Sequence, residues 1–246
     1  MIRSWAKSYL LKKNAILSRP PGQFNVTPLR LKKARDRGLK LNFAVDGGAS
    51  DGGWAREFLE IYPGAKVLCI EPREEVLIDL RKTAVEFPSI EIAKTLVGDK
   101  VGTVEFNVYQ DQSSIYTEHN QALGTRVVEN ITTIDTLIAE RKLPWPDLIK
   151  LDLQGAELNA LAGAAECMKH VQAVIMEVSF IPLMKGWPLI GDVIPFMNER
   201  GFVCYDISGL WQRPLDGALA QGDFFFLRKD HDLLKDHRWN KEGNWG

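Results

Sequence analysis

The chain has 246 residues, of which 45% are hydrophobic and 26% charged, so it is long enough for one large domain with a sizeable core. This near-average composition excludes intrinsic disorder, collagen and coiled coil for the chain as a whole. The longest stretch without Asp, Glu, Lys or Arg is residues 20–29, which is too short for a membrane-spanning helix of about 20 apolar residues.

The formal net charge of −1 hides an asymmetry along the chain. Residues 1–40 contain eleven Lys and Arg and one acid, Asp36, which gives +10, and the remaining residues carry −11. We therefore divide the chain into a basic N-terminal helical extension (1–40), an acidic body (41–229) and a C-terminal tail (230–246). The acidic body would repel phosphates, so we expect no nucleic-acid partner.

Apolar residues recur at helical spacing near the N-terminus, with basic residues around them. One interpretation of residues 1–17 is an interfacial helix that makes a peripheral contact with anionic lipid at the inner face of a membrane. The favoured interpretation is a helix that caps the domain or a solvated arm, because amphipathic helices usually face a core. The segment lacks the features of a signal peptide, and three scattered cysteines fit a reducing compartment, so we predict a cytoplasmic protein.

From residue 41 onward, short apolar runs alternate with helical patterns. The runs predict strands at 41–46, 66–71, 90–96, 103–109, 126–129, 148–153 and 173–179. The helical patterns lie at 54–62, 76–87, 133–141, 156–165 and 189–200. Two further strands, 202–207 and 224–228, are joined without a helical pattern, so we expect them to pair antiparallel. The sequence therefore predicts an α/β fold with a mostly parallel twisted sheet, helices on both faces and a C-terminal antiparallel hairpin.

The first predicted strand ends at Asp46 and runs into a glycine-rich loop, DGGASDGG (46–53). Glycines let the backbone turn sharply and approach a ligand, and the following helix start offers free N–H groups. Glu71 ends the next strand, where a carboxylate can accept hydrogen bonds from both hydroxyls of a ribose. Ligands of such sheets bind at the carboxyl ends of the strands, so these features predict an adenosine pocket.

Two cofactors fit this loop. The dinucleotide fingerprint would place Ala49 where close approach of a pyrophosphate needs glycine, and Asp46 would repel that group. The pattern acid-x-Gly-x-x-x-Gly of an S-adenosylmethionine loop is met by Asp46, Gly48 and Gly52. We therefore favour S-adenosylmethionine over NAD, and the remaining alternative is a glycine-rich turn without a ligand.

A third strand end carries the block KLDLQGAE (150–157). Lys150 and Asp152 are two residues apart on a strand and share a face, and Glu157 lies in the first turn of the next helix. Charged residues in an apolar strand are costly to bury unpaired, which predicts a Lys150–Asp152 ion pair. We also expect a functional role, because this strand end faces the pocket.

The order of these motifs resembles the FkbM family of S-adenosylmethionine-dependent methyltransferases over about residues 41–228. The segments that carry the resemblance include VDGGASDGGW (45–54), IEP (70–72), VGDKVGTVEF (97–106), IKLDLQGAELNALAGA (149–164) and IMEVSF (175–180). The K-x-D-x-x-G-x-E block is the most specific of them. Ser50 and Gln154 depart from the family, which often has Asn and Glu at these positions.

The resemblance implies the class I methyltransferase form of the Rossmann-like fold and methylation of a hydroxyl oxygen. The acceptor would be a sugar, a glycan or glycolipid, or a secondary metabolite, and Trp187 in a lid over 181–187 could stack on a sugar ring. The alternatives are an NAD-dependent enzyme and a non-catalytic nucleoside-binding module recruited to membranes. The expected donor-site residues are Asp46, Gly47, Gly48, Ala49, Ser50, Gly52, Glu71, Pro72, Gly98, Asp99, Ser113, Ser114 and Asp152.

Removal of a proton from a hydroxyl acceptor calls for a general base, and Asp152 is the first candidate for this base or for the group that orients the acceptor. Lys150 would hold Asp152 ionised or bind an acidic substrate group, with Glu157 and Glu177 in support. His119 is expected to be solvated. We expect no required metal: Asp152, Glu157 and Glu177 could ligate Mg²⁺, but carboxylates near strand ends more often pair with cations, and no His/Cys cluster supports zinc.

Overall fold

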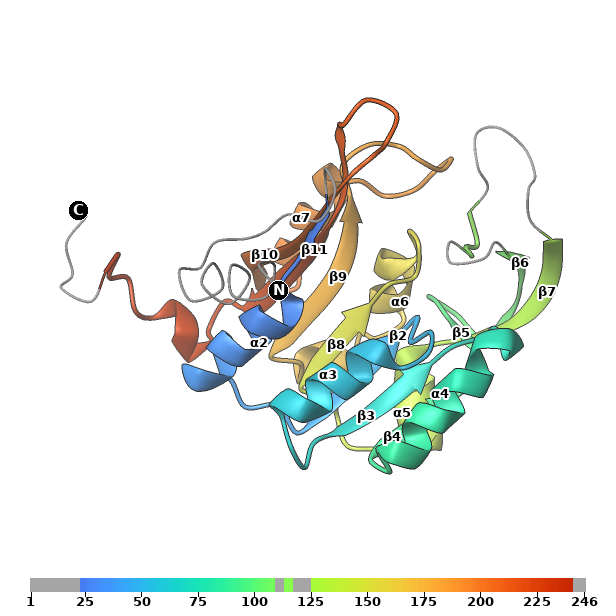
Figure 1. The fold of residues 1–246 in the computed structure, drawn as a ribbon, viewed down its shortest axis with the longest axis horizontal. Coiled ribbons are helices and arrows are strands. Elements are labelled where there is room, and N and C mark those ends of the chain that lie inside the picture. Colours follow the sequence, from blue (N-terminus) through green and yellow to red (C-terminus); the bar gives the residue numbers. More distant parts are fainter. Residues whose placement is uncertain (1–22, 109–112, 117–124, 241–246) are drawn as a thin grey trace, which may run out of the picture.

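The computed structural model describes residues 23–108, 113–116 and 125–240, which form an eight-stranded sheet between two layers of helices and a three-stranded sheet beside it (Figure 1). The order of the large sheet is β1-β10-β11-β9-β8-β2-β3-β4. The helix expected in residues 1–17, and His119, lie outside the described residues. In the described part of the chain, no helix is both long and apolar enough to cross a membrane.

Five neighbouring strands of the large sheet are parallel, and the other three continue it with antiparallel pairing. The parallel strands are β2 (Phe43–Gly47), β3 (Lys66–Ile70), β4 (Ile90–Ala93), β8 (Leu148–Leu151) and β9 (Ala173–Ser179). The antiparallel ones are β11 (Leu219–Arg228), which pairs with β9, β10 (Phe202–Gln212) and β1 (Gln23–Asn25). This confirms the predicted fold class and the C-terminal hairpin.

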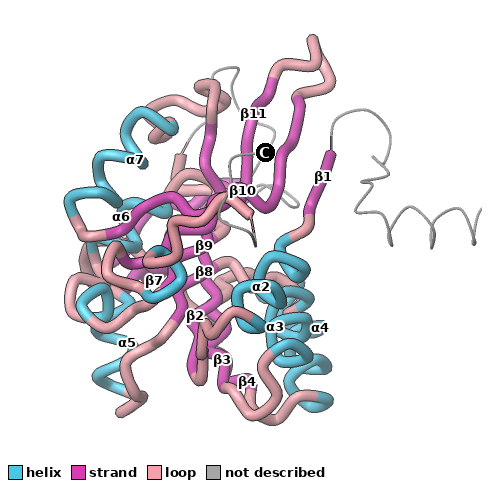
Figure 2. Tube along the Cα trace, turned by 90° about the vertical axis from the view of Figure 1, so that its left-hand side faces the viewer, coloured by secondary structure: helices cyan, strands magenta, loops and turns pink. Residues whose placement is uncertain are grey.

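The helices cover both faces of the sheet (Figure 2). One layer contains α2 (Thr27–Asp36), α3 (Gly53–Ile61) and α4 (Glu74–Glu86). The other contains α5 (Ile134–Glu140), α6 (Glu157–Ala162) and α7 (Ile190–Glu199). Two short 3₁₀ helices, Cys167–Lys169 and Asp232–Leu234, complete the described helical segments.

Alternation along the parallel strands divides the apolar side chains between two cores. Val45 and Ile149 belong to the core under α5–α7, whereas Ala44 and Leu148 belong to the core under α2–α4. Because helices bury both faces, these strands read as continuous apolar runs, which is why the sequence located them. The same alternation directs Asp46 and Lys150 toward the α3 face, at the carboxyl end of the strands.

The three-stranded sheet differs from the prediction. The run at 90–96 divides between β4 and β5 (Leu96–Val97), and β5 joins β7 (Thr125–Thr132) and β6 (Gly102–Val108) in the separate sheet. This sheet buries one small cluster, Leu96, Phe106 and Ile131. The strands of the small sheet are buried on one side only, whereas the central strands of the large sheet are covered on both faces. This difference is why β5, β6 and β7 form a sheet of their own.

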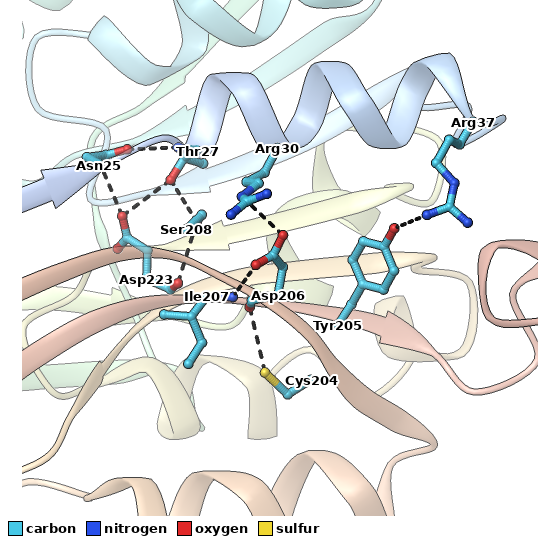
Figure 3. Close-up of polar contacts among 10 residues, drawn as sticks. All are labelled: Asn25, Thr27, Arg30, Arg37, Cys204, Tyr205, Asp206, Ile207, Ser208 and Asp223. Atoms are coloured by element: carbon cyan, nitrogen blue, oxygen red, sulfur yellow. Dashed lines mark hydrogen bonds and ion pairs between the residues drawn. The ribbon is translucent and has the colours of Figure 1, made fainter. Parts of the chain in front are cut away.

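Part of the basic extension belongs to the large sheet and its helix layer. Figure 3 shows how α2 is attached to the β10–β11 hairpin. Arg30 Nε lies 3.1 Å from Asp206 Oδ2, and Arg37 donates to the Tyr205 hydroxyl over 3.1 Å. The buried hydroxyls of Thr27 and Ser208 share a hydrogen bond of 2.8 Å. Residues 23–37 are therefore fixed against the β10–β11 hairpin.

Candidate functional site

Acidic side chains follow one another across five neighbouring strands, at the carboxyl edge of the parallel part of the sheet. The β2–β8 register places Asp46 opposite Lys150, and the β9–β11 register places Glu177 opposite Asp223. We use the name acidic row for the five carboxylates in strand order, which are Glu71, Asp46, Asp152, Glu177 and Asp223. So many carboxylates close together repel one another and favour protonation unless cations or hydrogen bonds compensate for them.

Lys150 is the compensating cation at the centre of the acidic row. Its Nζ lies 3.1 Å from Asp46 Oδ1, with the Asp46 side chain fully buried. Burial alone would lower the pKa of Lys150, but the charges of Asp46, Asp152 and Asp223 outweigh it and hold that pKa above its ordinary value. The predicted ion pair with Asp152 is therefore wrong: the strand register brings Asp46 directly beside the amine, and Asp152 lies beyond the end of β8.

Both carboxylate oxygens of Asp46 are buried and lack hydrogen bonds within the described part of the chain. Burial raises the pKa of its carboxyl group, and Lys150 opposes that rise. Apart from the ion pair, neither carboxylate oxygen accepts a hydrogen bond from the residues that the structure describes. Buried oxygens without hydrogen bonds are costly, so they suit a bound donor such as a cationic amino group.

The glycine-rich loop lies directly against the end of β8. Gly48 has φ +74°, and a Cβ there would clash with the carbonyl oxygen of Asp152. Gly52 has φ +83° and caps α3, and Gly47 has only 2.8 Å between a Cβ position and Leu151 Cδ2. Gly48 combines a left-handed backbone with close approach to a carbonyl, and only glycine fits there. The loop and Asp152 therefore hold each other in place.

Glu71 is buried and is oriented by the backbone on both sides. Ser50 N donates to its Oε2 over 2.9 Å, and Arg73 N donates to its Oε1 over 3.1 Å. The Arg73 guanidinium covers the same carboxylate, with Nε 2.9 Å from Oε1. A ribose that binds Glu71 would therefore replace the Arg73 side chain and leave the two backbone bonds in place.

A cavity of about 260 Å³, which we name the Glu71 cavity, opens beside this carboxylate. Six of the predicted donor-site residues line it: Gly48, Ser50, Glu71, Pro72, Ser113 and Asp152. The sequence interpretation missed the other wall, formed by Arg73 and by apolar residues of the small sheet and the segment after it, namely Leu96, Val97, Phe106 and Ile115. The segment VGDKVGTVEF contained Phe106, but nothing in it showed that this ring faces a cavity.

The other predicted donor-site residues lie around this cavity without lining it. Asp46, Gly47, Ala49 and Gly52 support the loop from behind. Gly98 packs against Ile131, and Asp99 is exposed next to it. The Ser114 hydroxyl donates to Gln154 O over 2.7 Å and so fixes the turn after β8.

A second cavity of about 300 Å³ lies on the α3 side of the same sheet edge, and we name it the Asp223 cavity. Its walls include Asn25 and Thr27, Trp54 of α3, Glu177, Trp211 and Asp223. Asp152 lines both cavities and is exposed at the point where they meet. Gln154 Nε2 donates to Asp152 Oδ1 over 2.8 Å and to Glu177 Oε2 over 3.1 Å, so one amide orients two carboxylates.

Glu157, Asp223 and Glu177 also have raised pKa values. Burial raises the pKa of Glu157 to about 7, although Leu153 N donates to its Oε1 over 2.7 Å. Burial, followed by the charge of Asp152, raises the pKa of Asp223 to about 6 and that of Glu177 well above its ordinary value. Glu157 lines neither cavity, so its place is behind the turn, where it holds the Leu153 and Gly155 amides.

Trp187 does not face either cavity. Its indole is buried on Gly155, where a Cβ would clash with the indole nitrogen. It therefore fixes the turn after β8, so this side chain is packed and does not stack on a sugar ring. Within the described ranges, no three His, Cys, Asp or Glu side chains come together as a metal site.

Comparisons with known proteins agree with the resemblance seen in the sequence. The family described as methyltransferase FkbM domain matches residues 46–204. A curated relative, 2-O-methyltransferase NoeI of Sinorhizobium fredii (strain NBRC 101917 / NGR234), is 24% identical over 170 residues, which are 61% of this chain and 70% of that protein.

Solved structures of methyltransferases also align with the chain. Methyltransferase FkbM from Methylobacillus flagellatus KT is 20% identical with a TM-score of 0.47, and the alignment covers 74% of this chain but only 43% of that one. Magnesium protoporphyrin IX methyltransferase (ChlM) from Synechocystis PCC 6803, solved with bound SAM, is 12% identical with a TM-score of 0.46. That alignment covers 82% of this chain and 76% of the other.

Glu157 makes the stability of the protein depend on pH. Its pKa is raised from an ordinary 4.5 to about 7, so the folded protein holds this proton more tightly than the unfolded chain. The stabilisation is present below pH 4.5 and is lost as the pH rises through 7, by roughly 3 kcal/mol. We expect Glu157→Gln to reduce this loss in urea denaturation between pH 4.5 and 8. Glu166→Gln, an exposed control, should follow the wild type, and identical profiles for all three proteins would contradict the assignment.

Proposed function

The chain belongs to the FkbM methyltransferase family, and on this premise we propose that it transfers a methyl group from S-adenosylmethionine to a hydroxyl oxygen of a sugar, a glycan or a secondary metabolite. The observation that carries the proposal is the junction of two cavities at Asp152. One cavity suits the donor and the other is open for an acceptor. The name of the related NoeI protein, a 2-O-methyltransferase, supports methylation at oxygen.

The residues around the Glu71 cavity fit S-adenosylmethionine. Glu71 would hold the ribose hydroxyls, and Ser50 and Pro72 would line the adenosine beside it. Asp46 lies behind the loop and not in the cavity wall, so its carboxylate would favour the cationic amino group through its charge. When bound, S-adenosylmethionine supplies an electrophilic methyl group on a cationic sulfonium. The acidic row favours that cation and repels a pyrophosphate, which argues against the NAD alternative.

Asp152 is placed to accept the proton of an acceptor hydroxyl or to orient that hydroxyl. It is exposed at the junction of the cavities, and Gln154 fixes its carboxylate. A glutamate at position 154, frequent in the family, would add a negative charge between Asp152 and Glu177. The amide instead donates to both, so the departure from the family fits this row of acids. The charge of Asp152 helps to raise the pKa of Lys150, whose own ion pair is with Asp46.

We further propose a cytoplasmic location and an acceptor that is a small molecule, a glycan or a glycolipid. A nucleic-acid partner is disfavoured, because the acidic row would repel phosphates at the site. Contact of residues 1–17 with an anionic membrane surface stays a prediction. The non-catalytic alternative differs in one respect, because such a module binds the nucleoside but turns over no acceptor.

Glu71→Ala should weaken the binding of S-adenosylhomocysteine at least tenfold, because hydrogen bonds from hydroxyls to a carboxylate contribute about 1.5–3 kcal/mol. The measurement is calorimetric titration, with NAD run in parallel as a ligand that should not bind. Glu74→Ala, which removes an exposed carboxylate at the start of α4, should leave the affinity within twofold. Unchanged affinity in Glu71→Ala would show that the ribose is held elsewhere.

Asp152→Asn should lower methyl transfer by roughly 10²–10⁴-fold, the range of general acid–base catalysis, while the affinity for S-adenosylhomocysteine stays within twofold. Transfer is measured as labelled methyl incorporated from S-adenosylmethionine into a panel of hydroxylated glycosides. Asp230→Asn, an exposed carboxylate at the opposite edge of the sheet, serves as the control. Turnover equal to that of the wild type would remove Asp152 from the mechanism, and no turnover by the wild type despite donor binding would favour the non-catalytic module.

A further inference from the structure

We propose that the Asp223 cavity is the acceptor subsite and that it takes an uncharged, polyhydroxylated ring, such as a neutral glycosyl unit. This inference rests on the function proposed above, because it assigns the donor to the Glu71 cavity. At about 300 Å³, the Asp223 cavity lies at the lower end of the size range of small-molecule sites. It shares Asp152 with the Glu71 cavity, so a ring seated in it presents its hydroxyls to that carboxylate.

Two tryptophans give this cavity an apolar surface. The Trp54 indole stacks on Phe58 with ring centroids 5.2 Å apart, which fixes its orientation at the start of α3. Trp211 lies over Gly209 of β10, where a Cβ would be 2.5 Å from the indole and 2.7 Å from Asp223 Oδ2. The missing side chain at Gly209 therefore makes room for an aromatic ring and a carboxylate side by side. Rigid amphipathic rings of this kind match the apolar C–H face of a sugar.

The polar part of the cavity consists of hydrogen-bonding groups beside that aromatic surface. Asp223 Oδ2 lies 3.5 Å from Asn25 Nδ2 and 3.4 Å from Thr27 Oγ1, both of which donate to it (Figure 3). Both contacts are longer than normal hydrogen bonds, so a hydroxyl at closer range can compete for the carboxylate. Asn25, Thr27 and Asp223 together offer both donors and acceptors to a polyol.

The charge of the cavity excludes an anionic ring. Asp152, Glu177 and Asp223 line it together with Lys150, whose amine is held by Asp46. Arg56 and Glu57, at the rim on α3, offset each other. A carboxylate or phosphate on the entering ring would therefore meet three carboxyl groups and one amine that is already paired. Lys150 could bind an acidic substrate group only by giving up its pair with Asp46.

Four residues of the cavity wall lie outside the part of the chain that matches the family. Asn25, Thr27, Trp211 and Asp223 all lie outside residues 46–204, the part that matches the family. They are brought together because β1 and α2 pack on the β10–β11 hairpin, as Figure 3 shows. The donor residues are thus within the family region, whereas the residues that would select the acceptor are supplied by the two flanking segments.

The test uses the full chain saturated with S-adenosylhomocysteine and saturation-transfer NMR with methyl glycosides. The probes are the methyl glycosides of glucose, galactose and mannose, each beside the matching uronic acid. We expect at least one neutral glycoside to bind at least fivefold more tightly than its uronate. Trp211→Ala and Asp223→Asn should each weaken that binding at least fivefold. The matched controls, Trp145→Ala and Asp230→Asn at the opposite edge of the sheet, should stay within twofold.

Calorimetry with S-adenosylhomocysteine on the same proteins separates the two proposals. Unchanged donor affinity in Trp211→Ala and Asp223→Asn, together with weaker glycoside binding, is the expected result. The inference would be overturned if uronates bind as tightly as neutral glycosides, or if no neutral glycoside binds. It would also be overturned if Trp211→Ala and the wild type bind the glycosides equally well. A loss of donor affinity in Trp211→Ala would also overturn it, because the cavity would then hold the donor. A wild-type protein that binds no S-adenosylhomocysteine would instead refute the proposed function.

Discussion

The ion pair between Lys150 and Asp46 joins β2 to β8 at the edge of the sheet where both cavities form. Five carboxylates of the acidic row converge there from neighbouring strands, and Lys150 lies among them. Removal of one partner from a buried pair typically costs about 3–5 kcal/mol, because the other charge is left uncompensated. This pair links the ends of β2 and β8. The glycine loop follows β2, and the turn with the exposed carboxylate of Asp152 follows β8.

On the proposed function, the acidic row would allow one edge of the sheet to serve two ligands. Its negative charge favours a cationic donor and disfavours an anionic acceptor, so the two cavities can differ in shape while sharing one electrostatic field. Burial favours the protonated form of some of these carboxyl groups, as the raised pKa values of Glu177 and Asp223 show. Gln154 and Gln221 then satisfy Glu177 by donating hydrogen bonds to it, without adding charge.

The parts of the fold that the sequence predicted are those with local signals. Strands buried on both faces appear as apolar runs, and their ends were marked by Asp46, Glu71 and the KLDLQGAE block. β1 has three residues and no period, so it did not stand out. The strands β6 and β7 were predicted, at 103–109 and 126–129, but their separation from the large sheet was not. The partner of Lys150 depended on the register of two strands that are far apart in the chain.

The Asp223 cavity could not be predicted from sequence patterns, because its walls come from segments nearly two hundred residues apart, such as Thr27 and Asp223. Its aromatic residues illustrate the same limit. Trp187 and Trp211 both follow predicted strands and look equivalent in sequence. Only packing shows that Trp187 is buried on Gly155, whereas Trp211 lines a cavity beside a carboxylate.

A crystal structure of the complex with S-adenosylhomocysteine would test the central claim most directly, namely that Asp152 lies between a donor site and an acceptor site. The account predicts the adenosine in the Glu71 cavity, the ribose hydroxyls on Glu71 in place of the Arg73 guanidinium, and the sulfur directed toward Asp152. The Asp223 cavity should remain open between Trp54 and Trp211. A ligand whose amino-acid portion fills the Asp223 cavity, or whose sulfur points away from Asp152, would contradict the account.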